Sequence, residues 1–344
     1  MKARFQKYIL NFKQASGTSR GVLRTKETFF IIIKDDDKKG VGECGLFRGL
    51  SIEDKPDYEE KLQWICNNIN LGKDILLKEA YGFPSIQFGL EQAFLSLESS
   101  NSFELFPSKF TEGNASIPIN GLVWMGTADF MKQQIKAKLK AGFITLKLKI
   151  GAIDFESEIE LLASIRKEFS FNEIELRVDA NGAFNPNEAL EKLKRLSDFD
   201  LHSIEQPIKA EQWSEMAGLC DMTPLPIALD EELIGVFSPL EKEKLIETIK
   251  PQYIILKPSL IGGIGGSEEW IELSKAHNVG WWITSALESN IGLNAIAQFT
   301  YSLNTDIPQG LGTGSLFTNN IESPLEVRKG TLYYNSDLQW NYNF

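Results

Sequence analysis

From about residue 115 onward, short apolar runs alternate with segments whose apolar residues recur at helical spacing. Eight of these runs have the length and composition of buried strands: residues 116–120, 143–150, 174–178, 202–205, 227–230, 253–257, 280–284 and 307–311. Strands that alternate with helices form parallel sheets. Eight such units over roughly 200 residues favour a TIM-like (β/α) barrel over an open sheet, within the α/β class.

The first hundred residues predict mixed α+β structure instead. Residues 29–34 and 41–44 are strand-like and flank a charged turn, as in a β-hairpin. Short strand-like pieces return after Gly314. We therefore expect three parts: an N-terminal α+β domain, a barrel domain, and a C-terminal segment that packs back on the first domain. Their expected ranges are 1–112, 113–314 and 315–344.

Charge and composition argue against several classes of protein. The formal net charge of −11 argues against a nucleic-acid partner or an anionic membrane, since both attract positive surfaces. The longest apolar run, residues 29–33, is far shorter than the roughly 20 residues that span a bilayer. The N-terminus lacks the apolar core of a signal peptide, so we expect a cytoplasmic protein. Three widely spaced cysteines indicate neither a disulfide framework nor a zinc site.

Charged residues stand at the C-terminal ends of five consecutive predicted strands. In chain order they are Lys147 and Lys149, then Asp179, Glu205, Asp230 and Lys257. Successive strand ends are about 25 to 30 residues apart, which is one βα unit each, and in a barrel these ends form the active-site rim. Taken singly, each residue could be a helix cap or an exposed side chain. The regular spacing of the whole set indicates one site.

Neighbouring strands would bring the three carboxylates of Asp179, Glu205 and Asp230 together. They would raise one another's pKa unless a cation offset their charge. Ligation by oxygen alone favours Mg²⁺ over zinc, with Mn²⁺ as the alternative. The second and sixth of eight strands lie opposite each other, so we expect Lys149 and Lys257 to face each other across a substrate.

Lys147 and Lys149 lie two residues apart and therefore share one face of their strand. Two neighbouring ammonium groups close to a cation would lower the pKa of a lysine. A lysine that acts as a general base requires this lowering.

The sequence resembles the enolase superfamily, in its muconate-lactonizing-enzyme subgroup, over nearly the whole chain. The matching motifs are Lys147-Leu148-Lys149, Val178-Asp179-Ala180-Asn181, Ile204-Glu205-Gln206-Pro207, Leu229-Asp230-Glu231, Leu256-Lys257-Pro258 and, near the N-terminus, Gly42-Glu43. This resemblance implies a modified (β/α)7β barrel closed by an α+β capping domain. It also implies abstraction of a proton α to a substrate carboxylate, with the resulting enediolate stabilised by Mg²⁺.

Within the superfamily, segments 285–289 and 312–314 resemble the o-succinylbenzoate synthase family. The resemblance implies dehydration of 2-succinyl-6-hydroxy-2,4-cyclohexadiene-1-carboxylate to o-succinylbenzoate in menaquinone biosynthesis. Dipeptide epimerases place an Asp-x-Asp pattern at the eighth strand, where this chain has uncharged glycine-rich sequence, so epimerase activity is disfavoured. An N-acylamino-acid racemase or a muconate-type cycloisomerase, which would use the same machinery, remains the alternative.

The resemblance also implies roles for individual residues. Lys149 would remove the α-proton and return it to the departing hydroxyl, and Lys257 would stabilise the anion from the opposite face. We assign four further residues to binding of the small carboxylate substrate: Lys147, Asn181, Ser285 and Arg20. Arg48 is the alternative to Arg20 as the partner of the succinyl carboxylate. Gly182 stands where some synthases of this family carry an arginine. The oligomeric state is not predicted.

Overall fold

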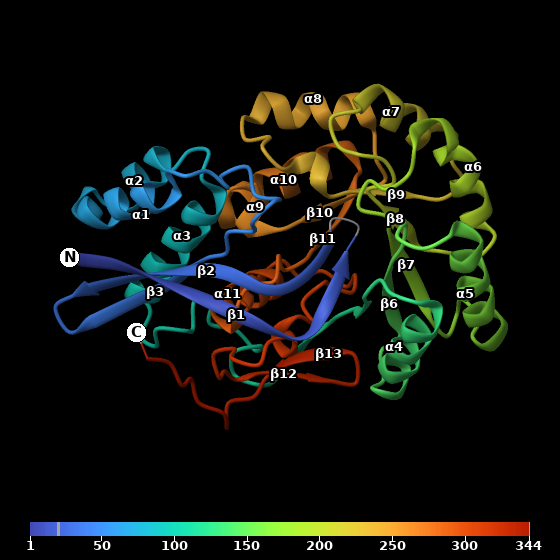
Figure 1. The fold of residues 1–344 in the computed structure, drawn as a ribbon. Coiled ribbons are helices and arrows are strands. Elements are labelled where there is room, and N and C mark those ends of the chain that lie inside the picture. Colours follow the sequence, from blue (N-terminus) through green and yellow to red (C-terminus); the bar gives the residue numbers. More distant parts are fainter. Residues whose placement is uncertain (19–20, 344) are drawn as a thin grey trace.

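The computed structural model describes residues 1–18 and 21–343 (Figure 1). The chain begins with a three-stranded antiparallel sheet of β1 (Lys2–Thr18), β2 (Gly21–Asp35) and β3 (Lys38–Cys44). The predicted hairpin is confirmed, because β2 and β3 pair from Phe29↔Cys44 to Asp35↔Lys38. The long strand β1 was not predicted, since Lys2, Arg4 and Lys7 interrupt its apolar residues.

Helices cover one face of this sheet. They are α1 (Tyr58–Asn67), η1 (Ile69–Leu71), α2 (Lys73–Glu79) and α3 (Pro84–Glu98). Their apolar side chains share a core with Phe29, Ile31 and Ile33 of β2. Helix α3 packs very closely on β3, because a Cβ at Gly42 would lie 2.0 Å from the Gly89 carbonyl oxygen.

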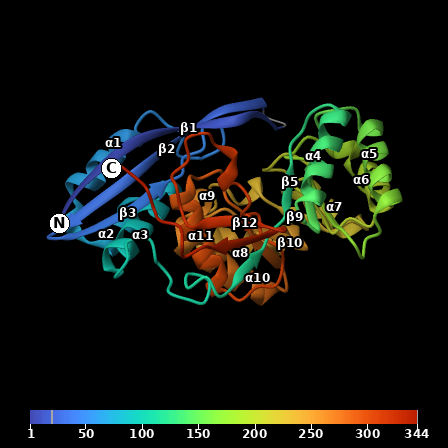
Figure 2. The same ribbon diagram turned by 90° about the horizontal axis from the view of Figure 1, so that it is seen from below.

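Within the described residues, the largest sheet has seven parallel strands in the order of the sequence. The strands are β5 (Gly121–Val123), β6 (Thr145–Lys149), β7 (Glu175–Asp179), β8 (Ser203–Glu205), β9 (Ile227–Leu229), β10 (Tyr253–Leu256) and β11 (Gly280–Ile283). Helices connect them: α4 (Ala128–Lys140), α5 (Phe155–Glu168), α6 (Pro186–Ser197), α7 (Trp213–Met222), η2 (Glu231–Leu233), α8 (Pro239–Ile249), α9 (Pro258–Ile261) and α10 (Gly263–His277). Figures 1 and 2 show the sheet curled, with helices around its outer side. The predicted α/β class is confirmed.

The first predicted barrel strand, over residues 116–120, is confirmed only in its last residues, where Ile119 pairs in parallel with Gln309. Residues Ser116–Pro118 form β4, which pairs antiparallel with β13 (Thr331–Tyr334) of a C-terminal hairpin, and the parallel sheet begins only at Gly121. The hairpin partner of β13 is β12 (Leu325–Arg328). The reason is packing, since buried Ile117 lies opposite buried Leu332. Local sequence cannot reveal a partner so far along the chain.

The predicted eighth strand over residues 307–311 is reduced to two isolated bridges. Gln309 pairs with Ile119, and Gly310 pairs with Thr284, both in parallel orientation. Pro308 cannot donate a backbone hydrogen bond, which disfavours a longer ladder here. Closure into an eight-stranded barrel therefore stays a prediction.

The C-terminal part contains α11 (Asn290–Ser302), η3 (Gly314–Leu316) and the hairpin described above. Its last residues contact the N-terminal part, where the Phe103 ring stacks on Trp340 with centroids 4.2 Å apart. The three-part domain division stays a prediction. In the part of the chain that the structure describes, every helix is too short or too polar to cross a lipid bilayer.

Candidate active site

Charged side chains from consecutive strands meet on the inner face of the parallel sheet. On β6, Lys147 and Lys149 alternate with Leu146 and Leu148, and all four are buried. Parallel register places Lys149 beside Asp179 on β7, and Asp179 beside Glu205 on β8. Asp230 directly follows β9, and Lys257 directly follows β10. Strand register thus brings together the residues on β6, β7 and β8, and the ion pairs of Lys257 with Asp230 and Glu205 join the last two predicted residues to them.

Ion pairs link each carboxylate of this site to a lysine. Asp179 Oδ2 lies 2.9 Å from Lys147 Nζ and 2.5 Å from Lys149 Nζ. Lys257 forms an ion pair with Asp230, and its Nζ lies 3.9 Å from Glu205 Oε1. Lys147 also forms an ion pair with Glu205. Glu205 on β8 therefore lies between Lys147, which comes from β6, and Lys257, which follows β10.

Burial and neighbouring charges shift the acidic pKa values in opposite directions. Burial, together with the charge of Asp179, raises the pKa of Glu205 well above its ordinary value. Burial also disfavours ionised Asp179, but Lys147 and Lys149 outweigh it and hold the pKa of Asp179 well below its usual range. The β6 lysines therefore favour ionised Asp179, whereas burial and a neighbouring carboxylate oppose ionisation of Glu205.

The pKa values of Lys147 and Lys257 are raised rather than lowered. Burial disfavours the Lys147 ammonium, but the charges of Asp179 and Glu205 outweigh burial and raise the pKa of Lys147. Asp230 and Glu205 likewise outweigh burial and raise the pKa of Lys257. The neighbouring carboxylates favour the charged form of these lysines, and a bound cation would offset that effect.

The three carboxylates offer oxygen donors from neighbouring strands. Glu205 is 2% exposed, and its contacts are the ion pairs with Lys147 and Lys257, because neither carboxylate oxygen has a hydrogen bond of ordinary geometry among the described residues. A buried carboxylate is costly unless positive charge lies beside it. Asp179 and Asp230 supply further oxygens from the adjacent strands, a donor set that suits Mg²⁺ or Mn²⁺.

A cavity of about 350 Å³ opens over the lysines, and Lys147, Lys149 and Lys257 contribute to its wall. The segment after β11 supplies Ser285, Ala286 and Leu287. The N-terminal part supplies several more wall residues: Lys13, Gln14, Ala15, Ser16, Leu23, Phe47 and Leu50. The N-terminal sheet and the parallel sheet therefore enclose the site together.

Comparison with known proteins identifies the family. The sequence profile described as "Enolase C-terminal domain-like" matches residues 130–337. The chain belongs to the enolase C-terminal domain-like family. The predicted resemblance to the enolase superfamily is thereby confirmed.

Three enolase-like relatives show how far the similarity extends. An o-succinylbenzoate synthase from Desulfotalea psychrophila (strain LSv54 / DSM 12343) is 47% identical, over 96% of this chain and 98% of that protein. The crystal structure of MenC from Desulfotalea psychrophila LSv54 has a TM-score of 0.86 at 44% identity, and the match covers 97% of this chain and 99% of that one. The dipeptide epimerase from Enterococcus faecalis V583, a complex with Mg and L-Leu-L-Tyr, has a TM-score of 0.81 at 19% identity, with 96% of both chains covered. This last similarity concerns the enolase-like fold alone.

The residues predicted to bind substrate differ in how they are placed relative to the cavity of this enolase-like chain. Ser285 lines the cavity, and its Oγ lies 2.6 Å from Thr313 Oγ1, which also lines it. Asn181 accepts a hydrogen bond of 2.8 Å from Lys149 Nζ, so it contacts a cavity lysine. Arg20 lies outside the described residues. Arg48 forms ion pairs with Glu27 and Asp54 and is not among the described residues that line the cavity.

Sequence reasoning missed the aromatic part of the cavity wall. Trp124 and Phe130 line the cavity from the segment after β5, and Phe47 lines it from the N-terminal part. Their only sequence signal is that Trp124 directly follows a short apolar run. Such a position is equally common for core residues, so the sequence cannot distinguish a residue of the cavity wall from a residue of the core.

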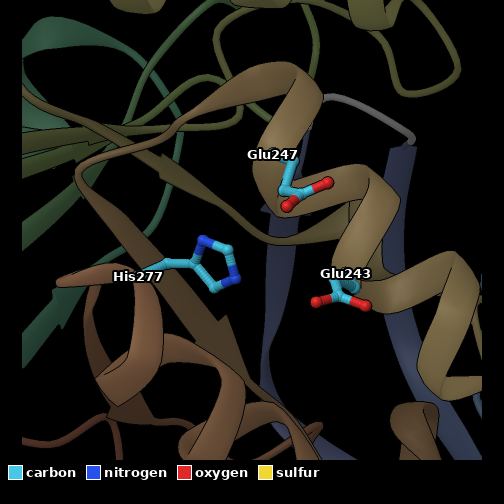
Figure 3. A group of neighbouring side chains, drawn as sticks. All are labelled: Glu243, Glu247 and His277. Atoms are coloured by element: carbon cyan, nitrogen blue, oxygen red, sulfur yellow. The ribbon is translucent and has the colours of Figure 1, made fainter.

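A second group of possible metal ligands lies on the outer helices, away from the lysines. Glu243 and Glu247 are one turn apart on α8, and His277 ends α10 (Figure 3). One ligand atom from each lies within 4.8 Å of the others. Both glutamates are exposed, as solvated acidic side chains commonly are. This group takes no part in the inner-face site of the enolase-like fold.

Proposed function

We propose that this chain is an o-succinylbenzoate synthase. It would dehydrate 2-succinyl-6-hydroxy-2,4-cyclohexadiene-1-carboxylate to o-succinylbenzoate in menaquinone biosynthesis. The observation that carries this proposal is the 47% identity to the Desulfotalea psychrophila synthase, which extends over 98% of that protein. The cavity lysines Lys149 and Lys257, each ion-paired with a carboxylate, supply groups that such a dehydration requires.

Asp179, Glu205 and Asp230 would hold the metal ion, which we propose to be Mg²⁺ or Mn²⁺. The presence of Mg in the similarly folded dipeptide epimerase supports this choice. When bound, the cation stabilises negative charge that develops on the substrate carboxylate as the α-proton leaves. It would also offset the carboxylate charges that raise the pKa of Lys147 and Lys257.

Lys149 is proposed as the general base and then as the general acid. Its neutral amine takes the α-proton, and the electron pair of the C–H bond shifts towards the carboxylate. When the C–O bond breaks, the proton passes from Lys149 to the hydroxyl, which leaves as water. The ring becomes aromatic, and the lysine returns to its starting state. Lys257 would place an ammonium on the other side of the substrate, where it stabilises the anion.

Ser285, Lys147, Asn181 and Arg20 are proposed to bind the substrate. The support for Ser285 and Lys147 is their place in the cavity wall, and the support for Asn181 is its hydrogen bond to Lys149. We further propose that the parallel sheet closes as a (β/α)7β barrel under a capping domain. Backbone hydrogen bonds support closure: Asn120 N donates to Gln309 O at 2.9 Å, and Gly310 N donates to Ile283 O at 2.8 Å.

The test is an assay of the purified chain with the cyclohexadiene substrate and Mg²⁺. We expect an aromatic product from the wild type and a kcat about 10²- to 10⁴-fold lower in Lys149→Ala, because one general acid–base group contributes about that much. The exposed Lys275 of α10 serves as the control, and Lys275→Ala should keep the wild-type rate. Absence of product, or an undiminished rate in Lys149→Ala, would contradict the proposal. Deuterium exchange of N-succinyl amino acids in D₂O without dehydration would indicate a racemase instead.

A further inference from the structure

A buried charged group lies where the N-terminal sheet meets the segment between β11 and α11. It consists of Lys26 on β2, Glu43 on β3 and Glu288, which lies just before α11. Lys26 is 6% exposed, and both glutamates are 0% exposed. None of the three is among the described residues that line the cavity. Burial of so much charge is costly, so the group requires an explanation beyond the proposed chemistry.

Glu43 holds the start of α11 from across this contact. One of its carboxylate oxygens accepts from Thr28 Oγ1 and from Ser289 N, each at 2.8 Å. The other accepts from Ser289 Oγ at 2.5 Å and from Gly292 N at 2.8 Å. A negative charge at a helix N-terminus is favourable, and here it belongs to the N-terminal sheet rather than to the helix itself. A Cβ at Gly292 would lie 3.0 Å from Glu43 Oε2, so little room remains between them.

Glu288 holds the cavity wall next to the substrate space. One of its oxygens accepts from Ala286 N at 2.7 Å, and the other accepts from the Ser259 hydroxyl. Ala286 lines the cavity, and Ser259 follows Lys257 by two residues. Leu287, between Ala286 and Glu288, has a φ of 65°. This left-handed conformation is strained for a branched residue, so the surrounding contacts must impose it.

Lys26 supplies the positive charge for both glutamates. In the described part of the chain, its Nζ has no hydrogen-bond partner, and the carboxylates of Glu43 and Glu288 act on it through their charge. Burial lowers the pKa of Lys26, and these two charges oppose that lowering. Burial in turn raises the pKa of Glu288, an effect that Lys26 reduces. Lys26 and Glu288 therefore each favour the charged form of the other across this contact.

We propose that Lys26, Glu43 and Glu288 are positioning residues that hold Ser285, Ala286 and Leu287 in the cavity wall against the substrate. The N-terminal sheet would thus set substrate affinity through side chains that do not touch the substrate. The inference rests on the proposed function, because that function assigns substrate binding to this cavity.

The test is the kinetics of Glu288→Gln with the cyclohexadiene substrate at saturating Mg²⁺. Glutamine keeps the shape but has one oxygen for the two donors, Ala286 N and Ser259 Oγ. Loss of one hydrogen bond of ordinary strength corresponds to about a tenfold change in affinity. We therefore expect KM to rise about tenfold, kcat to change less than about threefold, and the dissociation constant of o-succinylbenzoate, measured by calorimetry, to rise about tenfold.

The matched control is Glu91→Gln. Glu91 on α3 is another buried carboxylate that links the N-terminal part to the parallel-sheet part. It accepts from Ile264 N at 2.5 Å and from Gly265 N at 2.9 Å, away from the Ser285–Leu287 wall. We expect this variant to lower the melting temperature as Glu288→Gln does and to keep KM within about twofold. If Glu288→Gln does not fold, Ser259→Ala removes only the hydroxyl and should raise KM in the same direction.

The outcomes separate this inference from the proposed function. If the wild type forms no aromatic product, the proposed function fails and the inference fails with it. If the wild type is active, the inference alone is overturned in either of two cases. In one, Glu288→Gln leaves KM and product affinity unchanged; in the other, Glu91→Gln raises KM as much as Glu288→Gln does.

Discussion

Binding of Mg²⁺ is expected to raise the melting temperature of this protein. Only the folded chain brings Asp179, Glu205 and Asp230 together, since in the sequence they lie on separate strands about 25 residues apart. A ligand that binds the folded chain alone stabilises it by about 2.7 kcal/mol at 100 times its dissociation constant. The expected shift follows from this free energy and from the entropy of unfolding.

Unfolding entropy is about 2.1 cal/mol/K per residue, so 344 residues correspond to about 0.7 kcal/mol/K. At 100 times the dissociation constant, the melting temperature should therefore rise by about 4 °C. Differential scanning calorimetry over a series of Mg²⁺ concentrations, at constant ionic strength, measures this shift. Asp230→Asn removes one proposed ligand charge and should abolish most of it.

The matched control uses the outer group of ligands shown in Figure 3. The double variant Glu243→Gln, Glu247→Gln removes two exposed carboxylates and should keep the full Mg²⁺-dependent shift. Retention of the full shift in Asp230→Asn would refute the reasoning, and so would its loss in the double variant, because the cation would then bind elsewhere.

Three further predictions concern separate parts of the chain. Lys257→Met should lower kcat at least about 10²-fold in steady-state kinetics, because it removes the ammonium that stabilises the anion; a loss of less than about tenfold would contradict that role. Burial raises the pKa of Glu53 from 4.5 to about 8, so the wild type should lose stability relative to Glu53→Gln as the pH rises through that interval. If the difference in melting temperature between the wild type and Glu53→Gln stays constant across this pH range, Glu53 does not titrate there. Gly42→Ala should destabilise the chain by about 1–3 kcal/mol in urea unfolding, since its Cβ would lie 2.0 Å from the Gly89 carbonyl oxygen. Unchanged stability would mean that α3 can shift away from β3.

Much of the parallel sheet and of the lysine–carboxylate group could be predicted from the sequence. Each βα unit repeats one local pattern, and the C-terminal ends of parallel strands lie at the same edge of a sheet. Spacing alone therefore predicted that Lys149, Asp179 and Glu205 would be neighbours, and strand register places them so. The long strand β1 escaped prediction because charged residues interrupt its apolar pattern.

Other features could be decided only by the tertiary structure, because they depend on contacts between distant parts of the chain. β4 pairs with β13 rather than with the parallel sheet, across more than 200 residues. Lys26, Glu43 and Glu288 come from three separate elements, and no local pattern connects them. The sequence by itself determined which side chains stand at the strand ends, since periodicity is local. Packing decided which elements close over them, since burial and ion pairing depend on neighbours in space.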